Sequence, residues 1–331
     1  MSMGSILRVI GHAAIATASF LIGFSWPSAA LTQDWPTRNI TVVVPLGAGS
    51  ATDVMTRVVM DQVGKQLGRT IIVENRPGAG GTIGANMVAK AVPDGYTILA
   101  YGALPIAHAL YSKIPYDTLR DFLPLIPFGQ QPLVVVAAPS KGYKSLGDLI
   151  AAGKAKPGAL NYSSAGIGSA SHFAAERLLA SAGVTAQNIA FKGAAEAVTD
   201  IVAGRADFSI QPLTTTLALI GDGQLVAFAV SASKRATMMP EVPTTIEAGL
   251  PADSVYPFWS GLFLPANTPR DIVNVLHREV TTALQTPTVQ AQLAKLGAEP
   301  MPMTLDEFAK YFSDDVEANL KLVKAANIPR Q

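Results

Sequence analysis

The sequence has 331 residues, of which 25 are lysine or arginine, 24 are aspartate or glutamate and none is cysteine. This balance excludes the clustered basic surface that nucleic acid or an anionic membrane would require. The lack of cysteine excludes disulfides, thiol catalysis and cysteine-based metal sites. A chain of this length exceeds what one hydrophobic core usually serves, so we expect two domains.

Residues 1–30 have the pattern of a secretory signal peptide. Arg8 supplies a positive charge, Ala13–Phe24 is an apolar segment, and Ser28-Ala29-Ala30 resembles a cleavage site. The alternative is a membrane anchor, but the apolar segment is shorter than the ~20 residues that a spanning helix needs. We therefore expect cleavage near Ala30 and a periplasmic mature chain with a formal net charge of zero.

The first part of the mature chain predicts alternating strands and helices. Ile40–Val44 is a continuous β-branched run, typical of a strand buried on both faces of a parallel sheet. Apolar residues then recur at helical spacing from Asp53 to Leu67, and Gly68 ends the helix. Beyond it we expect strands at Ile71–Val73 and Thr97–Tyr101, a turn at Asn75–Gly81 and a helix at Ile83–Val92.

The stretch from Leu123 to Ala138 predicts an extended strand that crosses between domains, with prolines at 124, 127 and 132. A second α/β series follows. We expect its strands at Leu160–Ser163, Ile189–Phe191, Phe208–Gln211 and Leu225–Val230, and its helices at Ser145–Ala152, Ser171–Ala182, Ala194–Val202 and Thr214–Ile220. We expect a last strand at Trp259–Leu264 and helices at Arg270–Leu284, Val289–Leu296 and Leu305–Ala326. This alternation predicts parallel sheets in two lobes with a cleft between them.

Three glycine-rich loops follow predicted strands: Leu46–Thr52, Gly78–Thr82 and Ser163–Ser169. A glycine-rich turn that leads into a helix leaves backbone N–H groups unpaired at the positive end of the helix dipole, and such a site attracts anions. One such loop alone is better explained as a tight turn with a cap. Three of them favour a carboxylate or a phosphate held mainly by backbone donors.

Cofactor and metal sites are not expected. The G-x-G-x-x-G fingerprint of dinucleotide binding fails at Ile83 in one loop and at Thr52 in another, and no Gly-Lys-Ser/Thr follows any of the loops. The mature chain has three histidines, and no two of them have the i, i+4 spacing of a zinc site: His108, His172 and His277.

An exported serine hydrolase is the alternative from the residues themselves, with Ser164 or Ser169 as nucleophile and His172 as base. The segment lacks the G-x-S-x-G elbow that exposes a catalytic serine, and no orienting acid is evident beside the histidine. A capping or packing role at the helix start is the more ordinary assignment for His172. We therefore expect no catalytic residue.

Further candidates each have an ordinary structural role. Asp53 could complement a helix dipole, or it could orient the loop or a bound water. Arg76 and Lys192 could pair with an anionic ligand or with a surface carboxylate. Three aromatic residues could line a pocket or belong to the core: Tyr101, Phe191 and Trp259.

Six segments, in order, resemble those of the Bug-type receptors, the extracytoplasmic solute-binding proteins of tripartite tricarboxylate transporters. They are "VENRPGAGGTIGANMVAKAVPDGYTIL", "YDTLRDFLPL", "KSLGDLIAAGKAKPGALNYSSAGIGSASHFAAE", "FKGAAEAVTDIVAGRADF", "EVPTTIEAGLP" and "FWSGLFLPANTP". The likeness spans nearly the whole mature chain, and the block from "NRPGAGG" to "PDGYT" is quite specific.

The resemblance implies a two-lobed α/β periplasmic-binding-protein fold of type II, with a cleft that closes on a small carboxylate. Lobe 1 would comprise residues 31–128 and 252–331, and lobe 2 residues 129–251. It implies integral membrane subunits of a tripartite tricarboxylate transporter as partners, although the sequence does not separate transport from a role as the ligand-sensing partner of a membrane signalling protein. We expect a monomer.

The implied ligand-binding residues are Leu46, Ala48, Gly49, Ser50, Ala51, Asp53, Ser164, Ala165, Gly168, Ser169 and His172, with Tyr101 and Lys192 as secondary candidates. In the first loop the sequence departs from the family pattern: Leu46 replaces the usual aromatic residue, and Ala48-Gly49-Ser50 replaces Pro-Gly-Gly, while Asp53 is retained. These changes bear on which ligand is bound more than on how its carboxylate is held, because backbone donors survive side-chain replacement.

Overall fold

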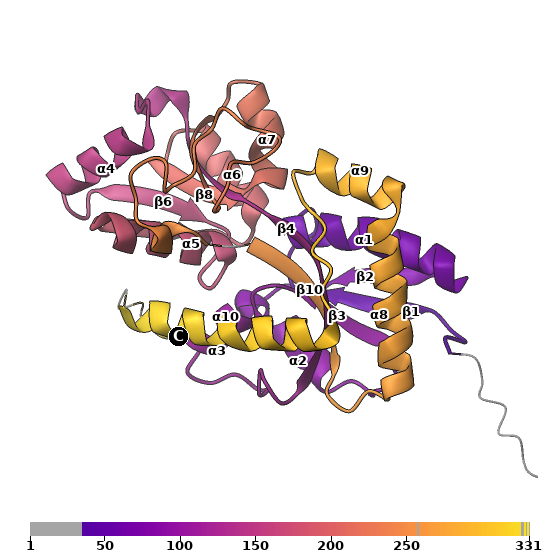
Figure 1. The fold of residues 1–331 in the computed structure, drawn as a ribbon. Helices are drawn as coiled ribbons and strands as arrows, with labels where there is room; N and C mark the ends of the chain where they lie inside the picture. Colours follow the sequence, from indigo (N-terminus) through magenta and orange to yellow (C-terminus); the bar gives the residue numbers. More distant parts are fainter. Residues whose placement is uncertain (1–34, 257, 326–327, 329, 331) are drawn as a thin grey trace, which may run out of the picture. The chain divides into compact units, whose positions relative to one another are not determined.

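The computed structural model describes residues 35–256, 258–325, 328 and 330, which belong to one compact unit. The predicted signal peptide, its cleavage site near Ala30 and the predicted end of the last helix at Ala326 lie outside the described residues. The unit contains two five-stranded sheets with helices against them (Figure 1). The predicted α/β fold class is thereby confirmed.

The first sheet has the strand order β2-β1-β3-β10-β4. Strand β1 pairs in parallel with β2 and β3, whereas β10 is antiparallel to both of its neighbours. The strands are β1 (Ile40–Val44), β2 (Ile71–Asn75), β3 (Thr97–Tyr101), β4 (Phe122–Gln131) and β10 (Phe258–Pro265). The helices that accompany them are α1 (Ala51–Leu67), α2 (Thr82–Ala89), α3 (Leu104–Leu110), α8 (Arg270–Gln285), α9 (Pro287–Lys295) and α10 (Leu305–Ala325).

The second sheet has the strand order β7-β6-β8-β5-β9. Strand β6 is parallel to β7 and β8, and β5 is antiparallel to β8 and β9. The strands are β5 (Leu133–Ala137), β6 (Leu160–Ser164), β7 (Ala186–Ala190), β8 (Phe208–Pro212) and β9 (Val226–Ser231). The helices of this part of the chain are α4 (Leu146–Ala155), α5 (Ala170–Ala182), α6 (Ala194–Val202) and α7 (Leu213–Gly221).

The segment predicted as one crossing strand is two strands in different sheets. Strand β4 ends at Gln131 and β5 begins at Leu133. Pro132 separates them, because proline has no N–H to donate to a ladder and is confined to strand edges and breaks. The residue numbers proposed for the two lobes remain a prediction, since the sheets alone do not fix where each lobe ends.

Helix boundaries differ from the prediction where a cap decides them. Helix α1 begins at Ala51 rather than Asp53, because the Ser50 hydroxyl accepts a hydrogen bond from the Asp53 N–H. Helix α3 was not predicted at all. Its residues are apolar almost throughout and six of the seven are buried, so it shows no polar face from which a helical period could be recognised.

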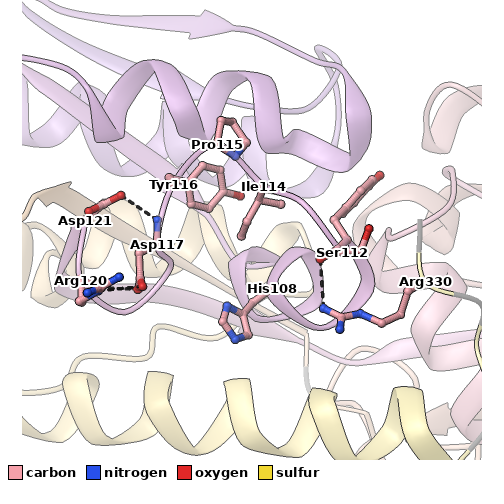
Figure 2. A pocket seen from close by; sticks show the side chains of 10 residues that line it. His108, Ser112, Ile114, Pro115, Tyr116, Asp117, Arg120, Asp121 and Arg330 are labelled. Atoms are coloured by element: carbon pink, nitrogen blue, oxygen red, sulfur yellow. Dashed lines mark hydrogen bonds and ion pairs between the residues drawn. The ribbon is translucent and has the colours of Figure 1, made fainter.

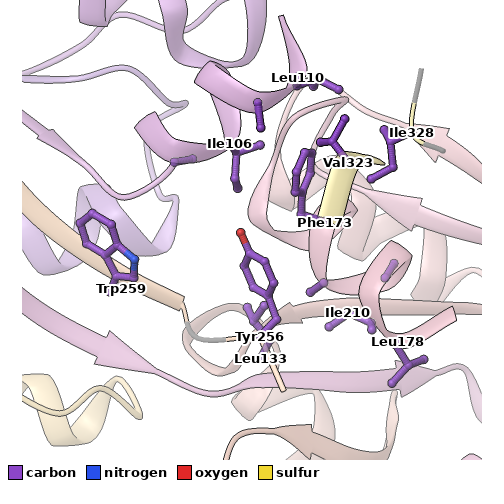
Figure 3. Close-up of a cluster of buried hydrophobic side chains, with 14 of the residues drawn as sticks. Ile106, Leu110, Leu133, Phe173, Leu178, Ile210, Tyr256, Trp259, Val323 and Ile328 are labelled. Carbon is purple, nitrogen blue, oxygen red and sulfur yellow. The ribbon is translucent and has the colours of Figure 1, made fainter. Parts of the chain in front are cut away.

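Three buried clusters form the core. One cluster packs the first sheet against α1, α8 and α9. Another packs the second sheet against α6 and α7. The third cluster draws side chains from both sheets and from α3, α5 and α10. Figure 3 shows part of it, with Tyr256 among Ile106, Leu133, Phe173 and Val323. Burial of this continuous apolar surface is the main favourable term that stabilises the fold.

Tyr256, which precedes β10, is held through both its backbone and its side chain. The Tyr256 N–H donates to the Ser231 hydroxyl at the end of β9, and the Tyr256 hydroxyl donates to Asn319 of α10. Within the described part of the chain, no helix has both the length and the apolar character needed to cross a membrane.

Candidate functional site

A cavity of about 650 Å³ lies beyond the carboxyl ends of the strands, where ligands bind in open α/β sheets. The three glycine-rich loops all contribute to its wall. Of the predicted ligand-binding residues, those on the wall are Leu46, Ala48, Gly49, Ser50, Ala51, Ala165, Gly168, Ser169, Tyr101 and Lys192. Three others lie behind the loops instead of on the wall: Asp53, Ser164 and His172.

The loop between β1 and α1 presents free backbone donors. Ser50 caps α1, and Gly49 has a φ of 78°, a left-handed conformation that suits glycine. Within the described residues, the N–H groups of Ala48, Ala51 and Thr52 have no hydrogen-bond partner. These donors stand at the positive end of a 17-residue helix, so the loop can hold an anionic oxygen.

Asp53 fixes the shape of this loop from behind. One carboxylate oxygen accepts from the Gly49 N–H at 2.9 Å, and the other accepts from Arg57 at 3.1 Å and from Asn75 at 3.0 Å. Burial raises the pKa of Asp53, but the hydrogen bonds from Arg57, Gly49 and Asn75 outweigh it and hold the pKa below its usual value. Asp53 is therefore ionised and orients the loop, which is one of the two roles considered from the sequence.

The loop between β6 and α5 has the same design on the other sheet. Ser169 caps α5 by accepting from the His172 N–H at 3.2 Å. The hydroxyl of Ser171 accepts from the Ala165 N–H at 2.9 Å. In the described part of the chain, the N–H groups of Ile167, Ala170 and Ser171 have no partner. A second set of helix-start donors thus contributes to the same cavity.

His172 holds this second loop through its side chain. Its Nδ1 atom accepts from the Gly168 N–H at 3.2 Å, so the neutral ring carries its proton on Nε2. The residue is buried, and burial lowers the pKa of His172 to about 4. Ser164 is also occupied, because its hydroxyl donates to Asn188 at 2.7 Å. Both residues shape the loop without reaching the cavity wall.

The third loop, after β2, adopts left-handed backbone conformations in succession. Ala79, Gly80 and Gly81 have φ values of 45°, 59° and 89°. The Tyr101 hydroxyl donates to the Gly80 carbonyl, and a Cβ on Gly81 would overlap that hydroxyl. Only glycine permits this close approach at position 81.

The remaining wall is largely aromatic and apolar, and includes Ile106, Phe191, Phe258 and Trp259. Its only charged side chains among the described residues are Lys192 and Glu196, both exposed. Glu196 accepts a hydrogen bond from the Lys192 N–H at 3.1 Å. Arg76 is absent from the wall and pairs with Glu74 at 2.8 Å. Backbone dipoles, more than cationic side chains, therefore set the electrostatics of the cavity.

Sequence reasoning missed several parts of the wall, including Ile106 of the unpredicted helix α3 and Tyr256 and Phe258 near β10. Two of the missed parts are polar. The beginning of α6, Gly193–Glu196, has no glycine-rich signature and no side-chain cap. Gln211 is one of two polar residues in the buried strand β8, with Ser209. Only its long polar side chain, at a fully buried position near the strand end, could have drawn attention to it.

A second cavity of about 530 Å³ lies along residues 108–121, with Arg330 at its edge (Figure 2). Two of its charged groups form an ion pair, because Arg120 lies 2.8 Å from Asp117. The Asp117 N–H donates to the Asp121 carboxylate, and Arg330 donates to the Tyr111 carbonyl. No predicted ligand-binding residue lines it. Over the described part of the chain, no cluster of three or more histidine, aspartate or glutamate residues could hold a metal ion.

Comparison with known proteins places the chain in a family. Residues 55–328 match the model of the tripartite tricarboxylate transporter family receptor. The BugT protein of Bordetella pertussis is 36% identical over 320 residues, which are 96% of each chain. A solved structure of a R. palustris protein with adipate is 29% identical, with a TM-score of 0.86 over 90% of this chain and 100% of that chain. MatC from Rhodopseudomonas palustris with bound malate is 32% identical, with a TM-score of 0.81 over 87% and 99% of the two chains. The chain belongs to the family of Bug-type receptors of tripartite tricarboxylate transporters.

Proposed function

We propose that the protein captures a small organic carboxylate in the cavity lined by loops from its two sheets. The observation that carries the proposal is the pair of helix starts, at α1 and α5, whose unpaired N–H groups contribute to one cavity from different sheets. Each set can accept an anionic oxygen without a cationic side chain. The adipate and malate seen in two related structures support a carboxylate as the ligand class.

Capture works by closure of the two lobes, because only a closed arrangement lets both loops contact one ligand. The closed receptor then delivers its ligand to the integral membrane subunits of a tripartite tricarboxylate transporter. This role includes export to the periplasm and action as a monomer. The family match supports the transport partner, and an uptake assay in a deletion strain separates transport from signalling.

Calorimetric titration of the folded mature protein with aromatic and aliphatic mono-, di- and tricarboxylates tests the proposal. We expect at least one ligand with a dissociation constant in the micromolar range, and a rise in melting temperature with the same ligand, since a ligand that binds only the native state stabilises it. Amides and esters of the same acids serve as controls and should not bind. Silence across the whole panel would overturn the proposal.

A hydrolase is disfavoured by the partners of the candidate residues. The hydroxyls of Ser164 and Ser169 make no hydrogen bond to a ring nitrogen of His172 within the described structure. The Nδ1 atom of His172 is occupied by the Gly168 N–H. A nucleophilic serine needs a base within hydrogen-bond reach, which neither residue has here.

Ser169→Ala discriminates between the two functions. We expect the wild type to show no turnover of p-nitrophenyl esters, and the variant to lose about 1 kcal/mol of stability because it loses the cap of α5. Chemical denaturation and an ester assay measure the two effects. Turnover in the wild type that disappears in the variant would favour the hydrolase.

A further inference from the structure

Gln211 holds a buried hydrogen-bond acceptor that nothing in the described structure satisfies. Its side chain is fully buried at the end of β8, and it is part of the wall of the main cavity. Its Nε2 atom donates to the Ser209 hydroxyl at 2.9 Å, but its Oε1 atom has no partner. Buried polar atoms are almost always paired, so an orphan acceptor on a cavity wall points to a missing donor.

The orientation of the Gln211 amide is fixed by its neighbours. The Ser209 hydroxyl has a single proton, which it donates to the Ser163 carbonyl at 2.6 Å. Ser209 can therefore only accept from Gln211, which requires the NH2 group on that side. Rotating the amide by 180° would place two acceptors together unless Ser209 gave up its bond to Ser163. The free oxygen is thus a consequence of the hydrogen-bond chain.

The donor that fits this place is a hydroxyl group. A carboxylate oxygen has no proton to offer Oε1 and would be repelled by it. An ammonium is disfavoured, because the start of α6 contributes to the same cavity with unpaired N–H groups at Ala194 and Ala195 and with the positive end of its dipole. The carboxylate on this wall, Glu196, is exposed and already accepts from the Lys192 N–H. A hydroxyl can accept from an N–H group and donate to Oε1 at once.

We propose that Gln211 makes the receptor selective for carboxylates that carry a hydroxyl group. This inference rests on the proposed function, and it assigns the two loops at α1 and α5 to the carboxylate and the end of β8 to the hydroxyl. A ligand that lacks the hydroxyl leaves Oε1 unpaired when the cavity closes. Because Oε1 is already buried and unpaired, a ligand hydroxyl raises affinity by supplying the missing hydrogen bond, and a ligand without the hydroxyl gains nothing there.

Matched ligand pairs test the selectivity by calorimetry: malate against succinate, 4-hydroxybenzoate against benzoate, and 6-hydroxyhexanoate against hexanoate. In the wild type we expect the hydroxylated member to bind about tenfold more tightly in at least one pair. Gln211→Met keeps the length of the side chain and removes the acceptor. It should reduce that ratio to about twofold or less, mainly by weakening the hydroxylated member. Gln187→Met, at an exposed position of β7, is the control and should leave the ratio unchanged.

The outcomes separate this inference from the proposed function. If the wild type binds both members of every pair equally, the role of Gln211 is overturned and carboxylate capture is not. This outcome is read from the wild type alone. A hydroxyl preference that survives in a folded Gln211→Met, or in Gln211→Leu if the first variant does not fold, also overturns it. If Gln211→Met weakens the binding of both members of a pair equally, a bound water occupies Oε1 and the selectivity proposal is overturned as well. Absence of any binding to the wild type contradicts the proposed function instead.

Discussion

Ala48→Asp is expected to weaken carboxylate binding by at least about 100-fold while leaving the fold unchanged. Ala48 is exposed on the cavity wall, in the loop that offers unpaired N–H groups to the ligand. A carboxylate at this position either occupies those donors itself or stands near the bound anion. Two like charges about 5 Å apart repel by roughly 3 kcal/mol at an effective dielectric constant near 20, which corresponds to about a 100-fold loss.

Ala48→Asn is the matched control, because it has the shape of aspartate without the charge. We expect it to lose no more than about tenfold, and we expect the stability of both variants to stay within about 0.5 kcal/mol of the wild type, as for exposed substitutions generally. Titration at two salt concentrations adds a second criterion, since salt screens the repulsion in the aspartate variant alone. Equal affinities for the two variants would show that the loop does not hold the anionic end of the ligand.

The glycine-rich loops could be predicted because their signals are local. A β-branched run, then glycine and serine, then a helical period specify strand, turn and capped helix within about twenty residues, as at Ile40–Leu67. Strand β3 and helix α5 were predicted for similar reasons. The convergence of the loops also follows from the rule that strand ends gather at one edge of a parallel sheet.

Other parts of the site could not be predicted from the sequence, because they depend on where side chains point. Asp53 and His172 lie next to the cavity in sequence, yet each turns its polar atoms toward its own loop: Asp53 to the Gly49 N–H and His172 to the Gly168 N–H. Gln211 belongs to the site only because β8 ends there. Such orientations are set by tertiary packing, which has no period or spacing in the sequence.

Because His172 is neutral and buried, its contribution to stability should disappear as the pH falls from 6.5 to 4. Burial lowers the pKa of His172 to about 4, whereas an unfolded histidine has a pKa near 6.5. Below pH 6.5 the unfolded chain therefore binds a proton that the native state refuses, and the free energy of unfolding decreases as the pH falls. The shift corresponds to a loss of about 3 kcal/mol across this window.

Two buried carboxyl groups act in the opposite direction. Burial raises the pKa of Glu176, whose Oε1 atom lies 3.9 Å from His172 Nε2, and raises the pKa of Asp315 on α10 to about 6. The native state takes up a proton on these groups before the unfolded chain does, so their contribution to stability grows as the pH falls. The wild type alone therefore cannot reveal the effect of His172, and a comparison with a variant is needed.

His172→Asn isolates the effect of His172 titration on stability. Asparagine Oδ1 can replace Nδ1 as the acceptor of the Gly168 N–H and does not titrate. We expect the free energy of unfolding of the wild type, minus that of the variant, to fall by about 3 kcal/mol between pH 7 and pH 4, measured by urea denaturation. Protonation of the carboxylate ligand weakens binding to both proteins at low pH. The ratio of wild-type to variant affinity should decline over the same window, because an imidazolium cannot accept from Gly168 and the loop at α5 loses its support. A difference that stays constant with pH would mean that the ring titrates normally in the native protein, and the loop would then owe its shape to Ser169 and Ser171 alone.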